Sequence, residues 1–91
     1  MQQPITLKLQ ENGQREIHGT TKDASEIGVL LFTVSEISQG TRVELTLTLL
    51  QDNAPAVCLF GSGRIVRVEA GAASARAVAV ECDQPLEQKH L

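Results

Sequence analysis

The amino-acid sequence predicts an all-β fold, a small antiparallel barrel or sandwich of about six strands. Short segments with alternating apolar and polar residues follow one another at close spacing, and turn-forming residues separate them. The chain has 91 residues, which is enough for one domain with one core, and 42% of them are hydrophobic. Because the only aromatic residues are two phenylalanines, the core must be built from Leu, Ile, Val and Ala.

The first half of the chain reads as three strands. Residues 5–9 alternate, and Asn12-Gly13 then gives a strong hairpin signal, because a type I′ turn needs positive φ at both central residues. The return strand is predicted over residues 15–21. A polar loop at residues 23–28 leads into residues 29–33, where apolar side chains occupy both faces of the predicted strand.

The second half adds three more strands. Residues 41–50 show the clearest alternation in the chain, with one apolar and one polar face. In the next strand, residues 57–70, the alternation changes step across Gly61-Ser62-Gly63, so these glycines predict a bulge or a sharp bend, as at a barrel corner. Residues 76–82 form the last strand. The residues expected to face inward on the first and last of these strands are Val43, Leu45, Leu47, Leu49, Val78, Val80 and Cys82.

The tail, residues 83–91, is predicted to form at most one or two helical turns, with Pro85 in the first turn. A helix of this length is not stable alone. We therefore expect a single domain over residues 1–91, with the barrel over about residues 4–82 and no long helix.

Composition excludes several classes of function. A net charge of −3 and a pI of 5.2 argue against binding to DNA or RNA, and the scarcity of aromatic residues argues against base stacking. No apolar run reaches membrane-spanning length, and the first residues lack the features of a signal peptide. Cys58 and Cys82 are expected to be reduced core thiols rather than a disulfide. We expect a cytoplasmic protein.

The sequence also predicts no enzyme, no metal site and no cofactor. It has neither a paired-carboxylate pattern nor a phosphate-cradling glycine loop. His18 and His90 lack metal-ligand spacing to each other or to the cysteines. Ser25, His18 and Asp23 are the residue types of a hydrolase triad, but no strand-to-helix nucleophile elbow accompanies them.

One polar string has a distinctive setting. Asp23, Ser25 and Gly28 spell D-x-S-x-x-G, and an apolar strand starts directly at the glycine. A later glycine turn opens the long alternating strand as Gly40-Thr41-Arg42-Val43-Glu44-Leu45, and the closing strand reads Ala77-Val78-Ala79-Val80-Glu81-Cys82. In these parts and their order the chain resembles a PilZ domain over about residues 4–82. The resemblance implies a six-stranded antiparallel barrel of bacterial origin that commonly acts as a receptor for cyclic di-GMP.

The resemblance also implies which residues hold the ligand. Family receptors use the D-x-S-x-x-G loop, here Asp23, Ser25 and Gly28, together with an R-x-x-x-R segment before the first strand. In this chain Met1-Gln2-Gln3-Pro4 takes that place, and no arginine precedes Arg15. Two charge-assisted contacts of about 1.5–3 kcal/mol each would be lost. Binding would weaken by about two to four decades.

Two functions follow as alternatives. The first is a non-catalytic bacterial signalling or adaptor domain with weak or lost cyclic di-GMP binding that acts through protein contacts. The second is a cyclic di-GMP receptor that uses the loop at residues 23–28. For Asp23 and Ser25 the alternative to ligand contact is a turn in which they satisfy backbone amides. Arg64 and Arg67 either extend a basic surface or are solvated charges on outward strand positions.

The strand that is apolar on both faces predicts a contact surface. If Val29 and Leu31 point inward, Leu30 and Phe32 point away from the core. Either the tail covers them, with Leu86 and Leu91 as candidates, or they form an exposed patch for a protein partner or a second copy, to which Ile37 adds. We therefore expect a protein partner or self-association.

Overall fold

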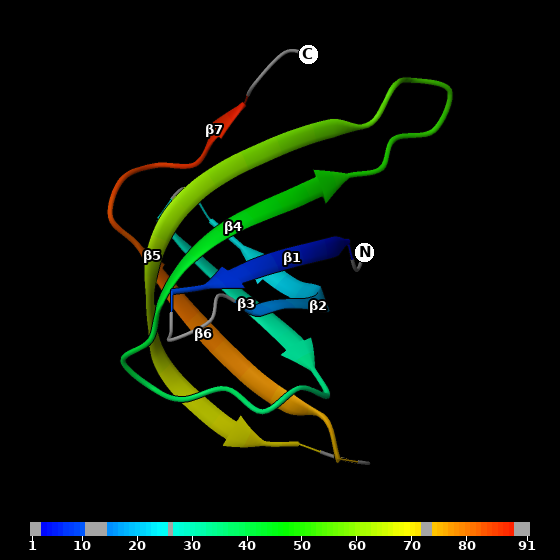
Figure 1. Ribbon diagram of the computed structural model, residues 1–91. Helices are drawn as coiled ribbons and strands as arrows, with labels where there is room; N and C mark the ends of the chain where they lie inside the picture. Colours follow the sequence, from blue (N-terminus) through cyan, green and yellow to red (C-terminus); the bar gives the residue numbers. More distant parts are fainter. Residues whose placement is uncertain (1–2, 11–14, 26, 72–73, 89–91) are drawn as a thin grey trace.

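The strands form one antiparallel sheet that closes into a barrel (Figure 1). The computed structural model describes residues 3–10, 15–25, 27–71 and 74–88. The strand order is β4-β1-β2-β3-β6-β5-β7, and a further pairing of β4 with β5 closes the sheet. The strands are β1 (Pro4–Leu9), β2 (Arg15–Ala24), β3 (Gly28–Thr33), β4 (Arg42–Leu49), β5 (Val57–Ala70), β6 (Arg76–Cys82) and β7 (Glu87–Gln88). The predicted six-stranded antiparallel barrel is confirmed.

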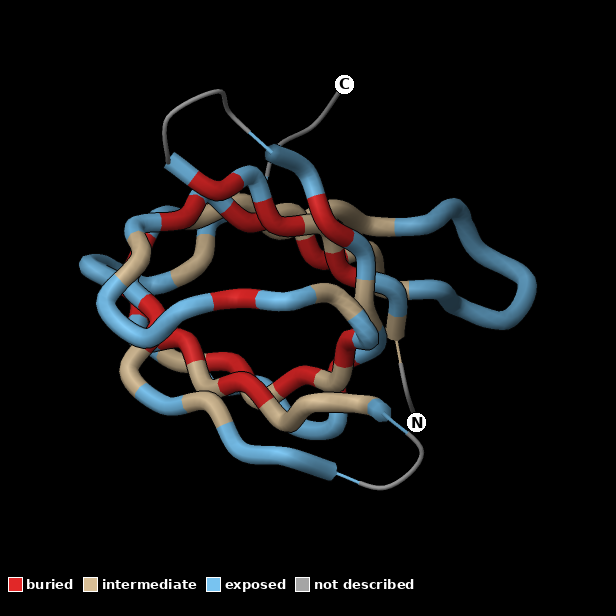
Figure 2. The backbone as a smooth tube through the Cα atoms, turned by 60° about the horizontal axis from the view of Figure 1, so that its bottom comes forward, coloured by how far each residue is buried: buried red, intermediate tan, exposed pale blue. Residues whose placement is uncertain are grey.

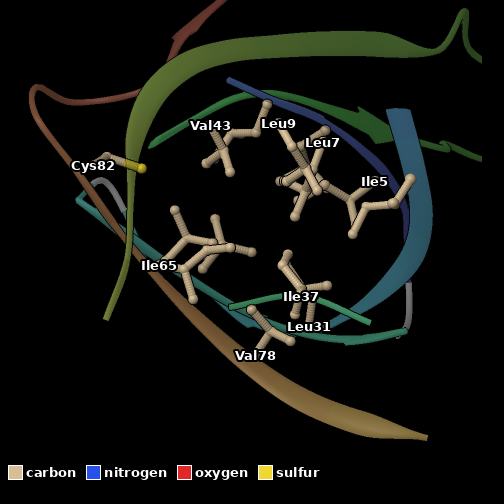
Figure 3. Close-up of a cluster of buried hydrophobic side chains, with 14 residues drawn as sticks. Ile5, Leu7, Leu9, Leu31, Ile37, Val43, Ile65, Val78 and Cys82 are labelled. Atoms are coloured by element: carbon tan, nitrogen blue, oxygen red, sulfur yellow. The ribbon is translucent and has the colours of Figure 1, made fainter. Parts of the chain in front are cut away.

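The core fills the inside of the barrel with aliphatic side chains that point toward one another (Figure 3). Alternation explains this, because successive side chains of a strand face opposite sides of the sheet. Among the residues predicted to face inward, Leu49 is only half-buried and the others are buried. The buried cluster consists of Ile5, Leu7, Leu9, Ile17, Val29, Leu31, Ile37, Val43, Leu45, Leu47, Ile65, Val78, Val80 and Cys82.

β5 turns the corner of the barrel, as its strong curvature shows (Figure 1). It pairs with β4 from Val57 to Arg64 and with β6 from Gly63 to Ala70. Gly63 and Arg64 are the residues paired with both β4 and β6, so β5 passes from one of these strands to the other there. The sharp bend predicted in this region lies at this change of partner.

The predicted bulge at Gly61-Ser62-Gly63 is wrong, because these residues pair with β4 in unbroken register. The register shift lies further along, between Ile65 and Arg67, where β5 faces β6. The residue between them, Val66, moves the inward-facing positions by one, so that Ile65 and then Val68 pack on the core. This later bulge accounts for the change of step in the sequence.

A strap of chain, residues 34–41, crosses one end of the barrel, and its middle is buried (Figure 2). Ile37 lies at this point and belongs to the core cluster, with 9% of its surface exposed. The prediction that Ile37 adds to an outer contact surface is therefore wrong. The strap is held by its backbone, because the amide of Gly40 donates to the carbonyl of Ile65 at 2.7 Å and the amide of Ile65 donates to Thr41 at 3.0 Å.

The tail does not form the predicted helical turns within the described residues. It runs along β5, and β7 pairs Gln88 with Leu59 and Glu87 with Phe60 (Figure 1). β6 leaves the edge of β5 at Gly63, so the backbone groups before that point need another partner. Pairing with this edge gives the backbone of the tail hydrogen-bond partners in the sheet, whereas one or two isolated helical turns would not be stable.

The first hairpin differs in one respect from the prediction. The return strand β2 extends to Ala24, three residues beyond the predicted end, and a register shift between Thr21 and Asp23 interrupts its pairing with β3. The predicted Asn12-Gly13 turn lies outside the described residues.

Gly63 gives a test of the barrel corner. A Cβ atom there would lie 2.2 Å from the carbonyl oxygen of Glu81, so we expect Gly63→Ala to lower the free energy of unfolding by about 2–4 kcal/mol. Gly28→Ala is the control, because its Cβ would meet its nearest neighbour, the carbonyl oxygen of Val80, at 3.4 Å. We expect that control to change stability by less than about 1 kcal/mol in urea unfolding. Equal destabilisation by both changes would contradict the assignment.

Candidate functional site

The D-x-S-x-x-G string forms a tight connection between β2 and β3. The amide of Ser25 donates to the carbonyl of Gly28 at 2.8 Å, and the Ser25 hydroxyl reaches the same carbonyl at 3.4 Å. The amide of Cys82 donates to the carbonyl of Ile27 at 2.8 Å, which ties the loop to the end of β6. Backbone hydrogen bonds therefore hold the loop, and the hydroxyl adds one long contact.

Asp23 and Ser25 are both exposed on this loop. The carboxylate of Asp23 accepts a hydrogen bond from the amide of Ala24 at 2.9 Å, so the local turn-stabilising role weighed in the sequence is present. A carboxylate has about four acceptor sites, and this contact uses one. Ligand contact by Asp23, Ser25 and Gly28 stays a prediction.

Gln3, which directly precedes β1, is held near this loop. The amide of Gln3 donates to the Thr21 hydroxyl at 3.1 Å, and the amide of Thr21 donates to the carbonyl of Gln3 at 2.8 Å. The side-chain oxygen of Gln3 accepts from the amide of Leu50 at 2.9 Å. Thr21 lies two residues before Asp23 in β2, so Gln3 lies at the same end of the barrel as the loop.

An apolar stripe adjoins the loop on the outer face. Leu30 is paired with Asp23 of β2 on one side and with Ala79 of β6 on the other. Phe32 is paired in the same way with Thr20 and Ala77. We call Leu30, Phe32, Ala77 and Ala79 the outer stripe, and all four are half-buried.

The tail does not cover the outer stripe as far as the described residues reach. Leu86 packs against the core cluster, and its Cδ2 lies 2.5 Å from where a Cβ of Gly61 would be. Leu91 lies outside the described residues. On the stripe itself, the Nζ of Lys22 lies 5.8 Å from the centre of the Phe32 ring. Of the two alternatives for Leu30 and Phe32, cover by the tail is not seen among the described residues, because the tail follows β5.

The arginines of the outer face have acidic neighbours. Arg67 is paired with Ala79 across the β5–β6 ladder, and its Nε lies 3.4 Å from the Glu69 carboxylate. Arg64 is paired with Glu81, and Glu81 is paired with Gly28 of the loop. A carboxylate therefore stands in the row between Arg64 and the loop, which disfavours an anion there.

An ion pair joins the start of β4 to the start of the tail. The Nη1 of Arg42 donates to the Asp83 carboxylate at 3.0 Å, and the amide of Asp83 donates to the carbonyl of Ser62 at 2.9 Å. The hydrogen bond from Arg42 holds the pKa of Asp83 below its ordinary value of 3.8, and the charges of Arg42 and Arg64 act in the same direction. The same contact raises the pKa of Arg42.

The two cysteines occupy different environments. Cys82 is buried, and burial, together with the charge of Asp83, raises the pKa of its thiol. Cys58 is half-buried, and its Sγ lies 4.0 Å from the Thr48 hydroxyl. The expectation of two core thiols is wrong for Cys58, because it lies outside the core cluster. Both are free cysteines.

A hollow lies beside the tail. It has a volume of about 550 Å³ and is bordered by the tail, β4 and β5, and its lining includes Lys8, Glu44, Phe60, Asp83 and Glu87.

Among the described residues, no three His, Cys, Asp or Glu side chains are placed to hold a metal ion, and no helix is long and apolar enough to span a membrane.

Sequence reasoning missed two features of this region. Ala77 and Ala79 complete the outer stripe. The sequence shows that they alternate with valines in the last strand, but it does not show that they lie beside Phe32 and Leu30 of β3. The contact between Arg42 and Asp83 joins residues far apart in the chain, and no local pattern indicates it.

Comparison with protein families supplies one match. A family model described as the PilZ domain matches residues 1–91. Comparisons with curated proteins and with solved structures find no match.

The pKa of Asp83 provides a test of the ion pair. Because it is lowered in the folded state, the contact stabilises the fold above pH 3.8 and is lost as the pH falls through the lowered value. In an NMR titration of the side-chain carboxyl, we expect Arg42→Gln to return the pKa of Asp83 toward 3.8. Arg64→Gln is the control and should shift it less, because Arg64 acts only through its charge. An unchanged midpoint in Arg42→Gln would rule out the contact.

Proposed function

This chain belongs to the PilZ domain family, and from that premise we propose that it is a non-catalytic adaptor of bacterial signalling that acts through protein contacts and binds cyclic di-GMP weakly or not at all. The family binds cyclic di-GMP and interacts with proteins. The observation that carries the proposal is the outer stripe, a row of half-buried apolar side chains that the described part of the tail leaves open.

The place of the stripe suits a protein contact. Leu30 and Phe32 lie on neighbouring outward positions of β3, and the small residues Ala77 and Ala79 beside them give a shallow surface. Asp23 borders the stripe at one end, and the Arg67–Glu69 pair flanks it on β5. An apolar centre with a charged rim is the usual arrangement of a protein interface.

The charges near the loop support the proposal of weak nucleotide binding. Cyclic di-GMP carries two negative charges, and arginine forks are the strongest side-chain partners for its phosphates. No arginine precedes Arg15 in this chain, and Glu81 lies between Arg64 and the loop. The nearest cation in the sequence, Lys22, lies over the Phe32 ring.

A receptor is the second candidate, and one observation favours it. Asp23 and Ser25 are exposed on a loop that backbone hydrogen bonds already close, so ligand binding would require little rearrangement of the chain. Because Asp23 is paired with Leu30, a ligand on the loop would also touch the outer stripe.

Calorimetric titration of the 91-residue chain with cyclic di-GMP separates the two functions. We expect a Kd weaker than about 100 µM, since two charge-assisted contacts are missing. Asp23→Ala is the matched variant, and its folding is checked by urea unfolding, where we expect a change below about 1 kcal/mol. A tighter Kd that is lost in Asp23→Ala would establish the receptor and overturn the proposal.

The adaptor function is tested through the outer stripe. A photo-crosslinker at position 32 is used to identify the partner in cells, and binding is then measured with the purified partner. We expect Phe32→Gln to weaken binding at least about tenfold, since buried aromatic residues dominate interface energetics. Thr46→Gln is the control, because Thr46 is half-buried on the outer side of β4. Equal affinity of the Phe32→Gln variant and the unchanged chain would contradict this assignment.

A further inference from the structure

The outer stripe lies in two rows that cross the same four strands. Across β2, β3, β6 and β5, the first row reads Asp23, Leu30, Ala79 and Arg67, and the second reads Thr20, Phe32, Ala77 and Glu69. On β3 the rows are two residues apart, which is roughly 7 Å along the strand. Each row therefore holds one large and one small apolar side chain between two polar ends.

The ends of the two rows carry opposite charges. In the first row, Asp23 on β2 is acidic and Arg67 on β5 is basic, and both are exposed. In the second row, Glu69 on β5 is acidic. The basic Lys22 on β2 lies next to this row, because its Nζ is 5.8 Å from the centre of the Phe32 ring. The order of charges in the second row is therefore the reverse of that in the first.

We propose that the outer stripe binds a second copy of this chain, in a two-fold symmetric dimer whose axis runs parallel to the strands. A half-turn about this axis places β2 of one copy over β5 of the other and β3 over β6, and each row stays at its own level. Leu30 then faces Ala79 of the second copy, and Phe32 faces Ala77 of the second copy. Each large side chain meets a small one, as close packing requires. The inference rests on the proposed function, because it takes the stripe to be a protein contact and names the partner.

The charges favour the same arrangement. Asp23 faces Arg67 of the second copy and Lys22 faces Glu69 of the second copy, and the symmetry makes each contact twice. Arg67 can reach a partner, because 61% of its side chain is exposed and its contact with Glu69 is made by Nε. The sheet is closed, so its outer face curves away from a partner on either side of the stripe. A long basic side chain in each pair bridges that distance.

A two-fold axis perpendicular to the strands fits less well. It would place Leu30 over Phe32 of the second copy, and Ala79 over Ala77 of the second copy. Two large side chains would then collide, and two small ones would leave a gap. Packing therefore selects the axis parallel to the strands.

The contact is small, so the dimer is weak. Four neighbouring strands place the ends of each row only about 15 Å apart. Interfaces that bury less than about 1,200 Å² are typical of weak complexes. We expect a Kd on the order of 100 µM.

Sedimentation equilibrium of the purified chain from about 10 µM to about 1 mM tests the dimer. Interference optics are used, because the chain has no Trp or Tyr. We expect Asp23→Arg and Arg67→Asp each to weaken self-association at least about tenfold, because each change places like charges face to face twice. Lys8→Asp is the matched control and should leave the Kd unchanged, because it reverses an exposed charge on β1, across the ring of strands from β6.

Mixing the two variants makes the test independent of any effect on folding. When an Asp23→Arg chain meets an Arg67→Asp chain, both contacts between positions 23 and 67 join opposite charges. The mixture should therefore regain the association that each variant alone has lost. With the axis perpendicular to the strands, position 23 faces Lys22 of the second copy, and mixing restores nothing.

Three results would overturn the inference: a monomer at about 1 mM, association that neither reversal weakens, or a mixture that associates no better than its components. The adaptor proposal fails separately, in the crosslinking test. A chain that is monomeric when pure, but whose position 32 captures a different protein, would contradict the dimer and leave the adaptor standing.

Discussion

The close approach of β5 to β6 at Gly63 is the constraint on which the rest of the barrel depends. A side chain at this position would run into the backbone of Glu81 and Cys82, so only glycine lets the two strands meet. Here β5 is paired with both β4 and β6, and this link between the two strands closes the sheet. The same change of partner leaves the earlier edge of β5 open, and the tail takes it as β7.

Closure of the barrel also determines which outward-facing residues lie side by side on neighbouring strands. The register of β2, β3, β6 and β5 places Asp23, Leu30, Ala79 and Arg67 in one line across four strands. Asp23 of the D-x-S-x-x-G string and the outer stripe are therefore direct neighbours, although they belong to different strands. The loop and the outer stripe therefore share one face of the barrel.

The two ends of the barrel carry different chemistry. At the loop end, an acidic side chain and a hydroxyl are exposed, and Glu81 separates them from Arg64. At the strap end, Arg15 and Arg76 meet around a polar hollow above the buried Ile37. The exposed acidic loop and the hollow bordered by arginines thus lie at opposite ends of β2. This separation is a property of the fold, because β2 carries Arg15 and Asp23 to opposite ends.

The sequence by itself determined the strands, the inward side chains and the loop, because these depend on alternation and turn residues over a few positions. Leu45 and Val78 are buried as their periodicity predicts, and Asp23 and Ser25 lie between two strands as their setting predicts. Only the tertiary structure decided the bulge at Val66, the burial of Ile37 and the pairing of the tail with β5. Each of these depends on which strand lies beside which, and a local pattern does not contain that information. An apolar residue such as Ile37 fits a surface or a core equally well until the strap that carries it crosses the open end of the barrel.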